Sequence, residues 1–306
     1  MTTPPVSSSL REALAGLEPD AAAIAARARA AMAGAGRVGV AYSGGVDSAV
    51  LLALAVAELG PEQVVAILGI SPSLAADERA AAHEVAAVIG ARVVEVATHE
   101  QDSTGYRAND VDRCFFCKDE LFTRISDEVV TEHALAAVAY GENADDARRP
   151  DRPGARAATN HRVLRPLAEA GASKAVVRQI ARAMALPCAD KPAAPCLASR
   201  IPHGHEVTPE KLHQVEEVEA GLRRLGFSDS RVRHHDQIAR IELVPEEIER
   251  AATPALRSAI HELVTGAGFR FAAVDLRGIQ SGAFTMSILN AGRTGAPGTP
   301  VPKPVS

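Results

Sequence analysis

Short apolar segments alternate with longer amphipathic ones in the first part of the chain. The apolar segments, which are typical of buried strands, are residues 38–42, 64–70, 92–96 and 135–140. Strands that alternate with helices form parallel sheets, so the pattern predicts an α/β fold with a doubly wound parallel sheet. Ligands of such sheets bind beyond the carboxyl ends of the strands.

We expect helices around these strands at residues 9–33, 48–59, 77–89, 117–125 and 165–187. A capping box from Ser9 to Glu12 opens the first of them, and two glycines at 34 and 36 close it. Pro187 stops the last one. Residues 141–161 are charged and lack periodicity, so we expect a long loop there.

The last part of the chain has a different pattern. Residues 188–204 are dense in proline, cysteine and basic residues, which excludes a regular helix or a central strand. Beyond them we expect a small α+β domain over an antiparallel sheet, with helices at 208–225 and 254–265 and strands at 231–235, 239–244 and 269–276. The predicted domains are therefore 1–190, a hinge at 191–204 that carries Cys196, and 205–290, followed by a disordered tail at 291–306.

Composition narrows the class of protein. The 306 residues can bury a sizeable core, and the net charge of -5 gives no basic field, so no nucleic-acid partner is expected. The longest apolar run, residues 49–57, is too short to span a bilayer, and the start of the chain shows no basic segment followed by an apolar one. We therefore expect a soluble, cytoplasmic protein without a membrane partner.

The junction between the first strand and the following helix carries the motif SGGVDS. The glycines allow a sharp turn, and the helix start aims its unpaired amides and positive dipole end at the same point. A strand, a Ser/Gly-rich turn and a helix in that order favour a phosphate site, and an aspartate there suits a bridging Mg²⁺. The alternative is that the polar residues only cap the helix. The candidate ATP-binding residues are Ser43, Gly44, Gly45, Val46, Asp47 and Ser48.

Other polar residues follow neighbouring strands at the same edge of the sheet. Ser71, in GISPSL, is placed to meet an adenine or a ribose, although a plain strand-to-helix loop explains it equally well. Asn143, Asp145 and Asp146 could reach the metal or the nucleotide, and a capped turn is the alternative.

The four cysteines indicate metal or redox chemistry more than a disulfide framework. Cys114, Cys117, Cys188 and Cys196 together could hold a structural zinc, although the second pair is more widely spaced than usual. Three of them, Cys114, Cys117 and Cys196, could hold a [4Fe-4S] cluster whose fourth iron lacks a protein ligand and could bind sulfide. The third possibility is buried thiols without a ligand, which the nearby Lys118, Arg113 and Arg200 weaken because these cations would favour thiolates.

The phosphate loop lacks the GK[ST] ending of a Walker A loop and resembles the PP-loop of the ATP pyrophosphatases, which fold like the adenine nucleotide alpha hydrolases and leave AMP on the substrate. Taken with other segments in the same order, the chain resembles the LarE family of ATP-dependent sulfur transferases. These segments are AYSGGVDSAVLL, GISPSL, YRANDVDRCFFCK, GENADD, RPL, DKPAAPCLASRIPHG, RVRHHDQIARIE and FRFAAVDL, spread over most of residues 10–290.

This resemblance implies a reaction. ATP and Mg²⁺ would adenylylate a carboxylate of pyridinium-3,5-biscarboxylic acid mononucleotide, and sulfur transfer would then give a thiocarboxylate of the nickel-pincer cofactor of lactate racemase. Cys196 matches the cysteine that one branch of the family sacrifices, while another branch uses three cysteines to hold a [4Fe-4S] cluster. Because CFFC is also present, the chain looks like the cluster branch. The implied partners are this small molecule and further copies of the chain.

The resemblance also implies substrate-binding residues around Cys196. Arg200, Arg231 and Arg233 could bind the substrate's phosphate or second carboxylate, with Ser199 and Glu219 beside them. Solvated arginines are the alternative for Arg233, and a solvated helix face is the favoured one for Glu219. We expect Cys196, Asp47 and Arg200 to be catalytic.

Two positions depart from the family pattern. Gln280 replaces an arginine expected near the C-terminus, and Cys188 is extra to the three-cysteine set. Competing functions are tRNA thiolation, amide formation like that of NAD or GMP synthetases, and a non-catalytic nucleotide- or zinc-binding protein.

Overall fold

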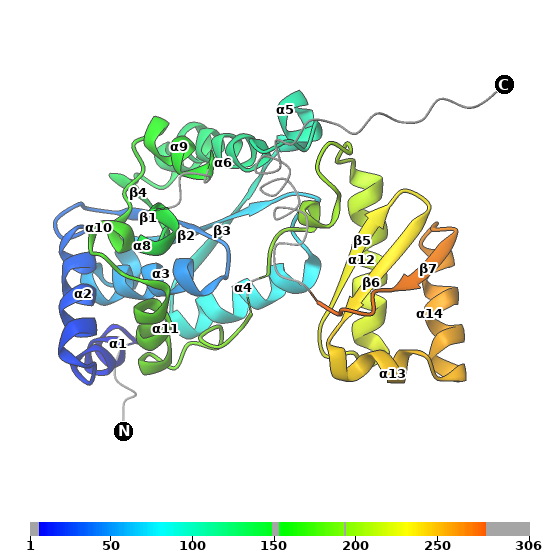
Figure 1. Ribbon diagram of the computed structural model, residues 1–306. Helices are drawn as coiled ribbons and strands as arrows, with labels where there is room; N and C mark the ends of the chain where they lie inside the picture. Colours follow the sequence, from blue (N-terminus) through cyan, green and yellow to red (C-terminus); the bar gives the residue numbers. More distant parts are fainter. Residues whose placement is uncertain (1–5, 149–152, 193, 280–306) are drawn as a thin grey trace, which may run out of the picture. The chain divides into compact units, whose positions relative to one another are not determined.

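The computed structural model describes residues 6–148, 153–192 and 194–279 (Figure 1). The chain divides into two compact units. One is Met1–Ala198 together with Glu206–His213, and the other is Ser199–His205 together with Gln214–Ser306. Gln280 and the tail expected at 291–306 lie outside the described residues.

The first unit is built on a four-stranded sheet in the order β3-β2-β1-β4, and every pair of neighbours is parallel. The strands are β1 (Val38–Tyr42), β2 (Val64–Ile70), β3 (Arg92–Ala97) and β4 (Ala137–Tyr140). Their positions agree with the apolar segments of the sequence, so the predicted parallel α/β sheet is confirmed. Since β1 lies in the middle of the sheet and all strands are parallel, the loops that follow β1, β2 and β4 emerge at one edge.

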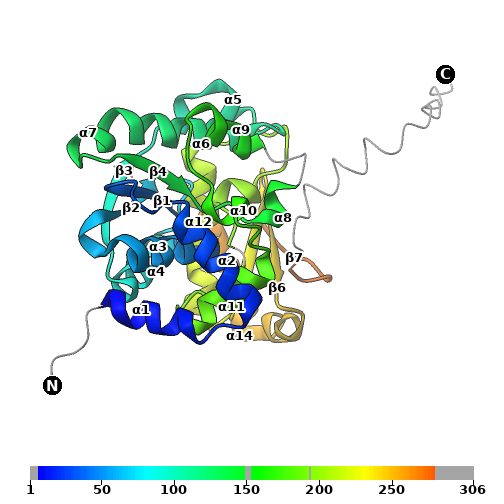
Figure 2. The ribbon, with the colours of Figure 1, turned by 90° about the vertical axis from the view of Figure 1, so that its left-hand side faces the viewer.

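Helices cover both faces of this sheet, as a doubly wound fold requires (Figure 2). One face packs against α3 (Val46–Leu59) and α4 (Ala76–Ile89). Outside α3 lie α1 (Val6–Ala15), α2 (Pro19–Ala30) and α11 (Lys174–Ala183). The other face packs against α6 (Arg113–Arg124), its continuation through a π-helical turn at Ile125–Val129 into α7 (Val130–Glu132), and α9 (Pro153–Asn160). Further helices of this unit are α5 (Thr104–Arg107), α8 (Ala144–Ala147) and α10 (Pro166–Glu169).

Two helix predictions and one loop prediction were wrong in detail. The single helix expected at 9–33 is α1 and α2, because Pro19 at the first position of α2 has no amide hydrogen with which to continue the preceding helix. The helix expected at 165–187 is α10 and α11, separated at Gly171, where φ is +75°. The loop expected at 141–161 contains α8 and α9, and its short polar helices carry too few apolar positions to show a period.

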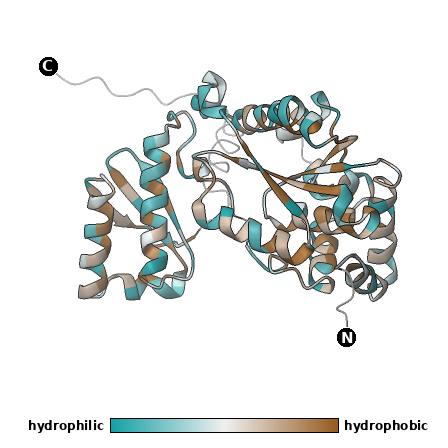
Figure 3. Ribbon diagram, turned by 180° about the vertical axis from the view of Figure 1, so that it is seen from behind, coloured by the Kyte–Doolittle hydropathy of each residue, from teal (hydrophilic) through white to brown (hydrophobic). Residues whose placement is uncertain are grey.

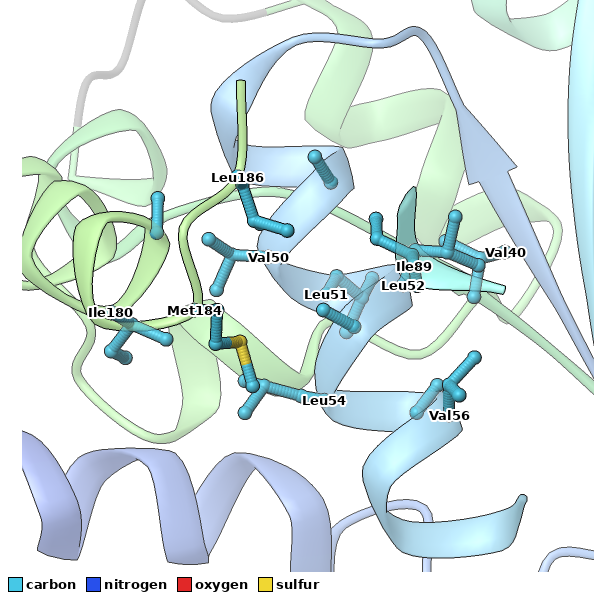
Figure 4. Close-up of a cluster of buried hydrophobic side chains, with 14 of the residues drawn as sticks. Val40, Val50, Leu51, Leu52, Leu54, Val56, Ile89, Ile180, Met184 and Leu186 are labelled. Atoms are coloured by element: carbon cyan, nitrogen blue, oxygen red, sulfur yellow. The ribbon is translucent and has the colours of Figure 1, made fainter. Parts of the chain in front are cut away.

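The core of the first unit surrounds α3, in which every residue from Ser48 to Ala57 is buried. Figure 4 shows side chains of α11 and the segment after it on one side of this helix, with Ile180, Met184 and Leu186 near Val50 and Leu54. A helix that is apolar all round is a central helix, and its burial fixes the direction in which its N-terminus points. In Figure 3 the central strands are brown along most of their length, as buried parallel strands should be.

The second unit holds a three-stranded sheet in the order β5-β6-β7. Its strands are β5 (Ser230–His235), β6 (Ile238–Leu243) and β7 (Phe271–Val274), and its helices are α13 (Ile248–Ala251), α14 (Pro254–Gly266) and the part of α12 (Pro209–Arg224) from Gln214 onward. The antiparallel sheet predicted here was only half right. β5 and β6 are antiparallel, but β7 is parallel to β6, because the helices between them carry the chain back to the same end of the sheet. In the described residues no helix is long and apolar enough to cross a membrane.

Candidate active site

The turn after β1 has the backbone geometry of an anion cradle. Gly44 has φ = +72°, and a Cβ atom there would lie 2.8 Å from Ala82 Cβ and 2.9 Å from Ala82 Cα. Only glycine fits both the left-handed backbone and this close approach to α4. Gly45 then takes the N-cap position of α3. The unpaired amides at the start of this buried helix therefore face the carboxyl edge of the sheet.

Hydrogen bonds inside the turn hold it in shape. The Ser43 amide donates to Ser48 Oγ at 3.2 Å, and Ser48 Oγ donates to the Gly45 carbonyl at 3.0 Å. The hydroxyls of Ser43 and Ser48 also lie 3.2 Å apart. Ser48 is buried, so it braces the loop, whereas the exposed Ser43 has the more accessible hydroxyl. Val46, also buried, packs the first turn of α3 into the core.

Asp47 is the point on which three helix starts converge. Lys174 Nζ, from the first residue of α11, lies 2.5 Å from Asp47 Oδ2. Asn143, the N-cap of α8, donates its side-chain amide to Asp47 Oδ1 at 3.2 Å and to Asp146 Oδ2 at 3.0 Å. Gly141 makes this approach possible, because a Cβ atom there would lie 2.8 Å from the Ser48 backbone.

The remaining acidic residue of this group acts on the backbone. Asp145 Oδ2 accepts from the Lys174 amide at 2.8 Å and so caps the start of α11. Asn143 and Asp146 therefore reach Asp47, and they also form the capped turn that was the alternative, since Asn143 Oδ1 accepts from the Asp146 amide at 2.9 Å.

Sequence reasoning missed Lys174, although a signal was present. A lysine in the first turn of a helix is disfavoured by the macrodipole, so its position after the N-cap Ser173 indicates a role beyond helix formation. Asp47 and Lys174 together offer a carboxylate for a divalent cation and an ammonium group for a phosphate.

The loop after β2 lies at the same edge of the sheet as the SGGVDS turn, and it is hydrogen-bonded to the segment that carries Cys196. Ser71 is half-buried, and its hydroxyl accepts from the Ser73 amide at 3.2 Å. The Ser73 carbonyl in turn accepts from the Leu197 amide at 3.0 Å. The residue after Cys196 is therefore fixed to the loop in which Ser71 was predicted to contact the nucleotide.

Three of the four cysteines influence one another. Cys114 and Cys196 are exposed and Cys117 is half-buried, and all are free thiols. Burial raises the pKa of Cys117 well above its usual range, and the charges of Glu100, Cys196 and Cys114 add to the effect. Lys118 lowers the pKa of Cys117, as expected of a nearby cation, but burial raises that pKa more, so a thiolate is not favoured at Cys117.

Cys188 is separate from this group. It is buried in the core around α3, beside Leu186 and Ala189, and burial raises the pKa of its thiol. It therefore resembles the inert buried thiol among the alternatives. A zinc site made from all four cysteines would require Cys188 to leave the core.

The thiols of the other three cysteines are ligands that suit iron or zinc, but they are not arranged closely enough around one point to coordinate an ion in this conformation. No group of three or more His, Cys, Asp or Glu side chains within the described ranges is close enough to hold a metal ion.

Glu100, beside Cys117, is a second residue that the sequence analysis did not single out. It is 1% exposed, and neither carboxylate oxygen has a hydrogen-bond partner. A buried carboxylate without a donor or cation is costly, so this region fits an added positive group.

In the second unit, Arg200 and Glu219 form a buried pair. Arg200 Nε donates to Glu219 Oε1 at 2.9 Å and Nη2 donates to Oε2 at 3.1 Å, while Arg200 Nη1 donates to Ser199 Oγ at 3.0 Å. Glu219 Oε1 also accepts from the Val232 amide at 2.8 Å. The expected solvated helix face was wrong for Glu219, which is 4% exposed, because Arg200 and the amide satisfy its carboxylate inside the unit.

The two arginines of β5 are also paired with carboxylates. Arg233 is buried, donates to Glu242 Oε2 at 2.9 Å and to the Ser199 carbonyl at 3.1 Å, and so is not the solvated arginine of the alternative. Arg231 pairs with Asp229 and donates to the Ser230 carbonyl at 2.8 Å. Ser199, Arg200 and Arg233 therefore form one connected group, and Arg231 lies at the start of the same strand.

Comparison with known proteins supports the family indicated by these motifs. A family model described as asparagine synthase matches residues 21–139, which include the phosphate loop and most of the parallel sheet. An uncharacterized protein of Synechocystis sp. is 42% identical over 247 residues, covering 79% of this chain and 90% of its own length. The pyridinium-3,5-bisthiocarboxylic acid mononucleotide synthase of Lactiplantibacillus plantarum is 31% identical over 255 residues, covering 83% of this chain and 91% of its own length. The chain thus belongs to the LarE family of the PP-loop superfamily, whose members are ATP-using enzymes.

Proposed function

We propose that the protein is an ATP-dependent sulfurtransferase that acts on pyridinium-3,5-biscarboxylic acid mononucleotide. In this proposal ATP adenylylates a substrate carboxylate with loss of pyrophosphate, and a sulfur nucleophile then displaces AMP to give a thiocarboxylate. The convergence of Asp47, Lys174 and the start of α3 on one point is the observation that carries the first step. The similarity to the pyridinium-3,5-bisthiocarboxylic acid mononucleotide synthase of Lactiplantibacillus plantarum supports the choice of substrate.

The residues of the phosphate loop, together with Ser71 and Lys174, would each have a separate role in the adenylylation. The amides after Gly44 and the Ser43 hydroxyl would hold phosphate oxygens, and Ser71 would contact the nucleoside. Asp47 would bind Mg²⁺, which neutralises the charge that develops on the pyrophosphate leaving group. When Mg²⁺ binds Asp47, the ammonium group of Lys174 would leave this carboxylate and bind a phosphate oxygen. Asp47 then pairs with the divalent cation, and Lys174 pairs with the phosphate.

The sulfur step would take place at Cys196. When bound, a [4Fe-4S] cluster held by Cys114, Cys117 and Cys196 would supply an exchangeable sulfide. The exposed Cys196 could also give up its own sulfur, as in the other branch of the family. Both routes need an exposed Cys196 beside the loop that contacts the nucleotide, and the Leu197–Ser73 hydrogen bond supports that placement.

Recognition of the substrate's anionic groups is proposed for the second unit. Ser199, Arg200, Arg231 and Arg233 supply donors that match a phosphate or a carboxylate, and Glu219 orients Arg200. The net charge of -5 supports a small molecule over a nucleic acid as the partner. We also propose that the protein is cytoplasmic and forms a homo-oligomer. A sedimentation measurement on the purified protein would test the oligomeric state.

Pyrophosphate release tests the proposed adenylylation. The protein should release pyrophosphate from ATP only with Mg²⁺ and the pyridinium dicarboxylate nucleotide present, and mass spectrometry should then find the thiocarboxylate. Asp47→Ala should abolish release, while Asp77→Ala, at the first turn of α4, should not. Release of pyrophosphate by Asp47→Ala at the wild-type rate would contradict the site.

A further inference from the structure

Arg113 is buried between two segments that are far apart in the sequence. It begins α6, is 8% exposed, and donates through Nη1 to Asn109 Oδ1 at 2.6 Å and to the Ala198 carbonyl at 2.9 Å. The second of these bonds joins residues 85 positions apart. An arginine has this reach and geometry because its planar group can donate to several acceptors at once.

The segment around Cys196 is thereby fixed on both sides of Leu197. The Leu197 amide donates to the Ser73 carbonyl at 3.0 Å, and the carbonyl of the next residue, Ala198, accepts from Arg113. Ala198 is also the last residue of the first unit before the chain enters the second. These two bonds therefore attach Cys196 to the ATP-binding unit.

The same guanidinium lies beside the thiols. Burial lowers the pKa of Arg113, but its electrostatic interactions with Cys196 and Cys114, together with a hydrogen bond to the adjacent Cys114, raise that pKa overall. A buried cation is costly unless anions or acceptors surround it. Here the partners are the Ala198 carbonyl, the Asn109 amide and the two thiol groups.

We propose that Arg113 is a positioning residue that holds Cys196 beside Cys114 and Cys117 through the Ala198 carbonyl. This inference rests on the proposed function for its purpose, which is to keep the sulfur site assembled beside the adenylylating loop. The geometric part is independent of the reaction and can be measured without ATP or substrate.

Disulfide formation between the thiols measures the geometry directly. The metal-free protein is treated with diamide, which accepts two electrons and two protons as two thiols become one disulfide, and peptide mapping gives the rate for Cys196 with Cys114 or Cys117. In Arg113→Met this rate should fall about tenfold or more, since a released segment lowers the effective concentration of the two thiols. Arg113→Lys keeps the positive charge but loses the planar guanidinium group. Its rate of disulfide formation should lie between those of the wild type and Arg113→Met.

The matched control is Arg124→Met, at the other end of α6, where the side chain pairs with Glu120 and Glu128 at the surface. It should leave the disulfide rate unchanged. A wild-type rate in folded Arg113→Met would overturn the proposal, and if that variant fails to fold, a wild-type rate in Arg113→Lys would do the same.

The second readout separates this role from general stability. Pyrophosphate release by Arg113→Lys should stay near the wild-type level while thiocarboxylate formation falls about tenfold or more, because only the sulfur site is displaced. Equal loss of both activities would overturn the positioning role. If the wild-type protein releases no pyrophosphate, the proposed function fails, and the disulfide rates still decide the placement by Arg113.

Discussion

Lys174 Nζ lies 2.5 Å from Asp47 Oδ2, and the two residues are 127 positions apart in the chain. The pair joins the start of α11 to the first turn of the buried helix α3. Its lysine side chain is 38% exposed, so the pair contributes little to stability. The position of Lys174 at a helix start beside the phosphate loop is better explained by a role in binding an anion than by a contribution to stability.

Replacement of Lys174 by methionine should therefore reduce catalysis more than stability. We expect kcat/KM for ATP to fall on the order of 100-fold, the size of effect expected when one hydrogen-bond donor to the developing negative charge is lost. Steady-state pyrophosphate release measures this. Lys191→Met is the control, because Lys191 also forms one surface ion pair, with Glu78 at 2.7 Å, but lies outside the proposed site. Similar losses in both variants would contradict a role for Lys174 in ATP binding.

Gly44→Ala should destabilise the protein through both backbone strain and a clash. The left-handed φ alone costs about 1–2 kcal/mol for a residue with a Cβ atom. At Gly44 the new Cβ atom would also lie 2.8 Å from Ala82 Cβ. Gly34→Ala is the matched control, since φ there is +73° with nothing within 4 Å of the added atom.

Urea denaturation of the two glycine variants separates these effects. Gly34→Ala should lose only the strain part, about 1–2 kcal/mol, and Gly44→Ala should lose clearly more. Equal losses would mean that the turn moves away from α4 without cost, and the close approach would then not constrain the cradle.

The sequence was sufficient for the strands because their apolar runs reflect burial on both faces of a parallel sheet. The glycine turn after β1 was predictable because only a few residue types allow its backbone, and its role in binding phosphate stays a prediction. Glu100 and the Arg113–Ala198 bond were not predictable from the pattern, because each depends on residues that meet only after the chain has folded. At Lys174 the lysine in a first helical turn was a signal, but its partner Asp47 is 127 positions away and could not be named from the sequence.

The second unit shows the same limit for charged residues. Glu219 lies on a helix whose polar positions suggest solvent, and only the fold places it against Arg200 and the Val232 amide. The parallel pairing of β7 with β6 also depends on the path of the connecting helices, which strand patterns do not record.

The four thiols should differ in reactivity. With iodoacetamide at pH 8 and the metal removed, Cys114 and Cys196 should react first because they are exposed. Cys117 should react slowly and speed up only as the pH rises beyond the ordinary thiol range, because its raised pKa keeps it protonated. Cys188 should react only in denaturant. Peptide mapping over time gives the four rates, and a fast Cys117 at pH 8 would contradict the burial described here.

Metal analysis tests the proposed cluster. Protein purified without oxygen should contain iron and sulfide near the stoichiometry of one [4Fe-4S] cluster, with the matching absorbance. Cys114→Ala, Cys117→Ala and Cys196→Ala should lose them, and Cys188→Ala should keep most, because Cys188 lies in the core. Stoichiometric zinc without iron would exclude the cluster and leave Cys196 itself as the sulfur source to be tested.

Glu219→Leu should destabilise the second unit strongly. It removes the carboxylate that pairs with Arg200 through two hydrogen bonds, and the side chain of Arg200 is only 5% exposed, so a buried cation loses its bidentate counter-charge. The expected loss is about 3–5 kcal/mol, measured by thermal or urea unfolding. The control Glu247→Gln weakens a more exposed pair with Arg250, at 3.4 Å, and should cost less than about 1 kcal/mol. The double variant Arg200→Met with Glu219→Leu should recover much of the loss, because no charge then remains buried. If the double variant is as unstable as Glu219→Leu, the Val232 amide and local packing matter more than the ion pair, and Arg200 would then be available to an anionic substrate at little cost to the fold.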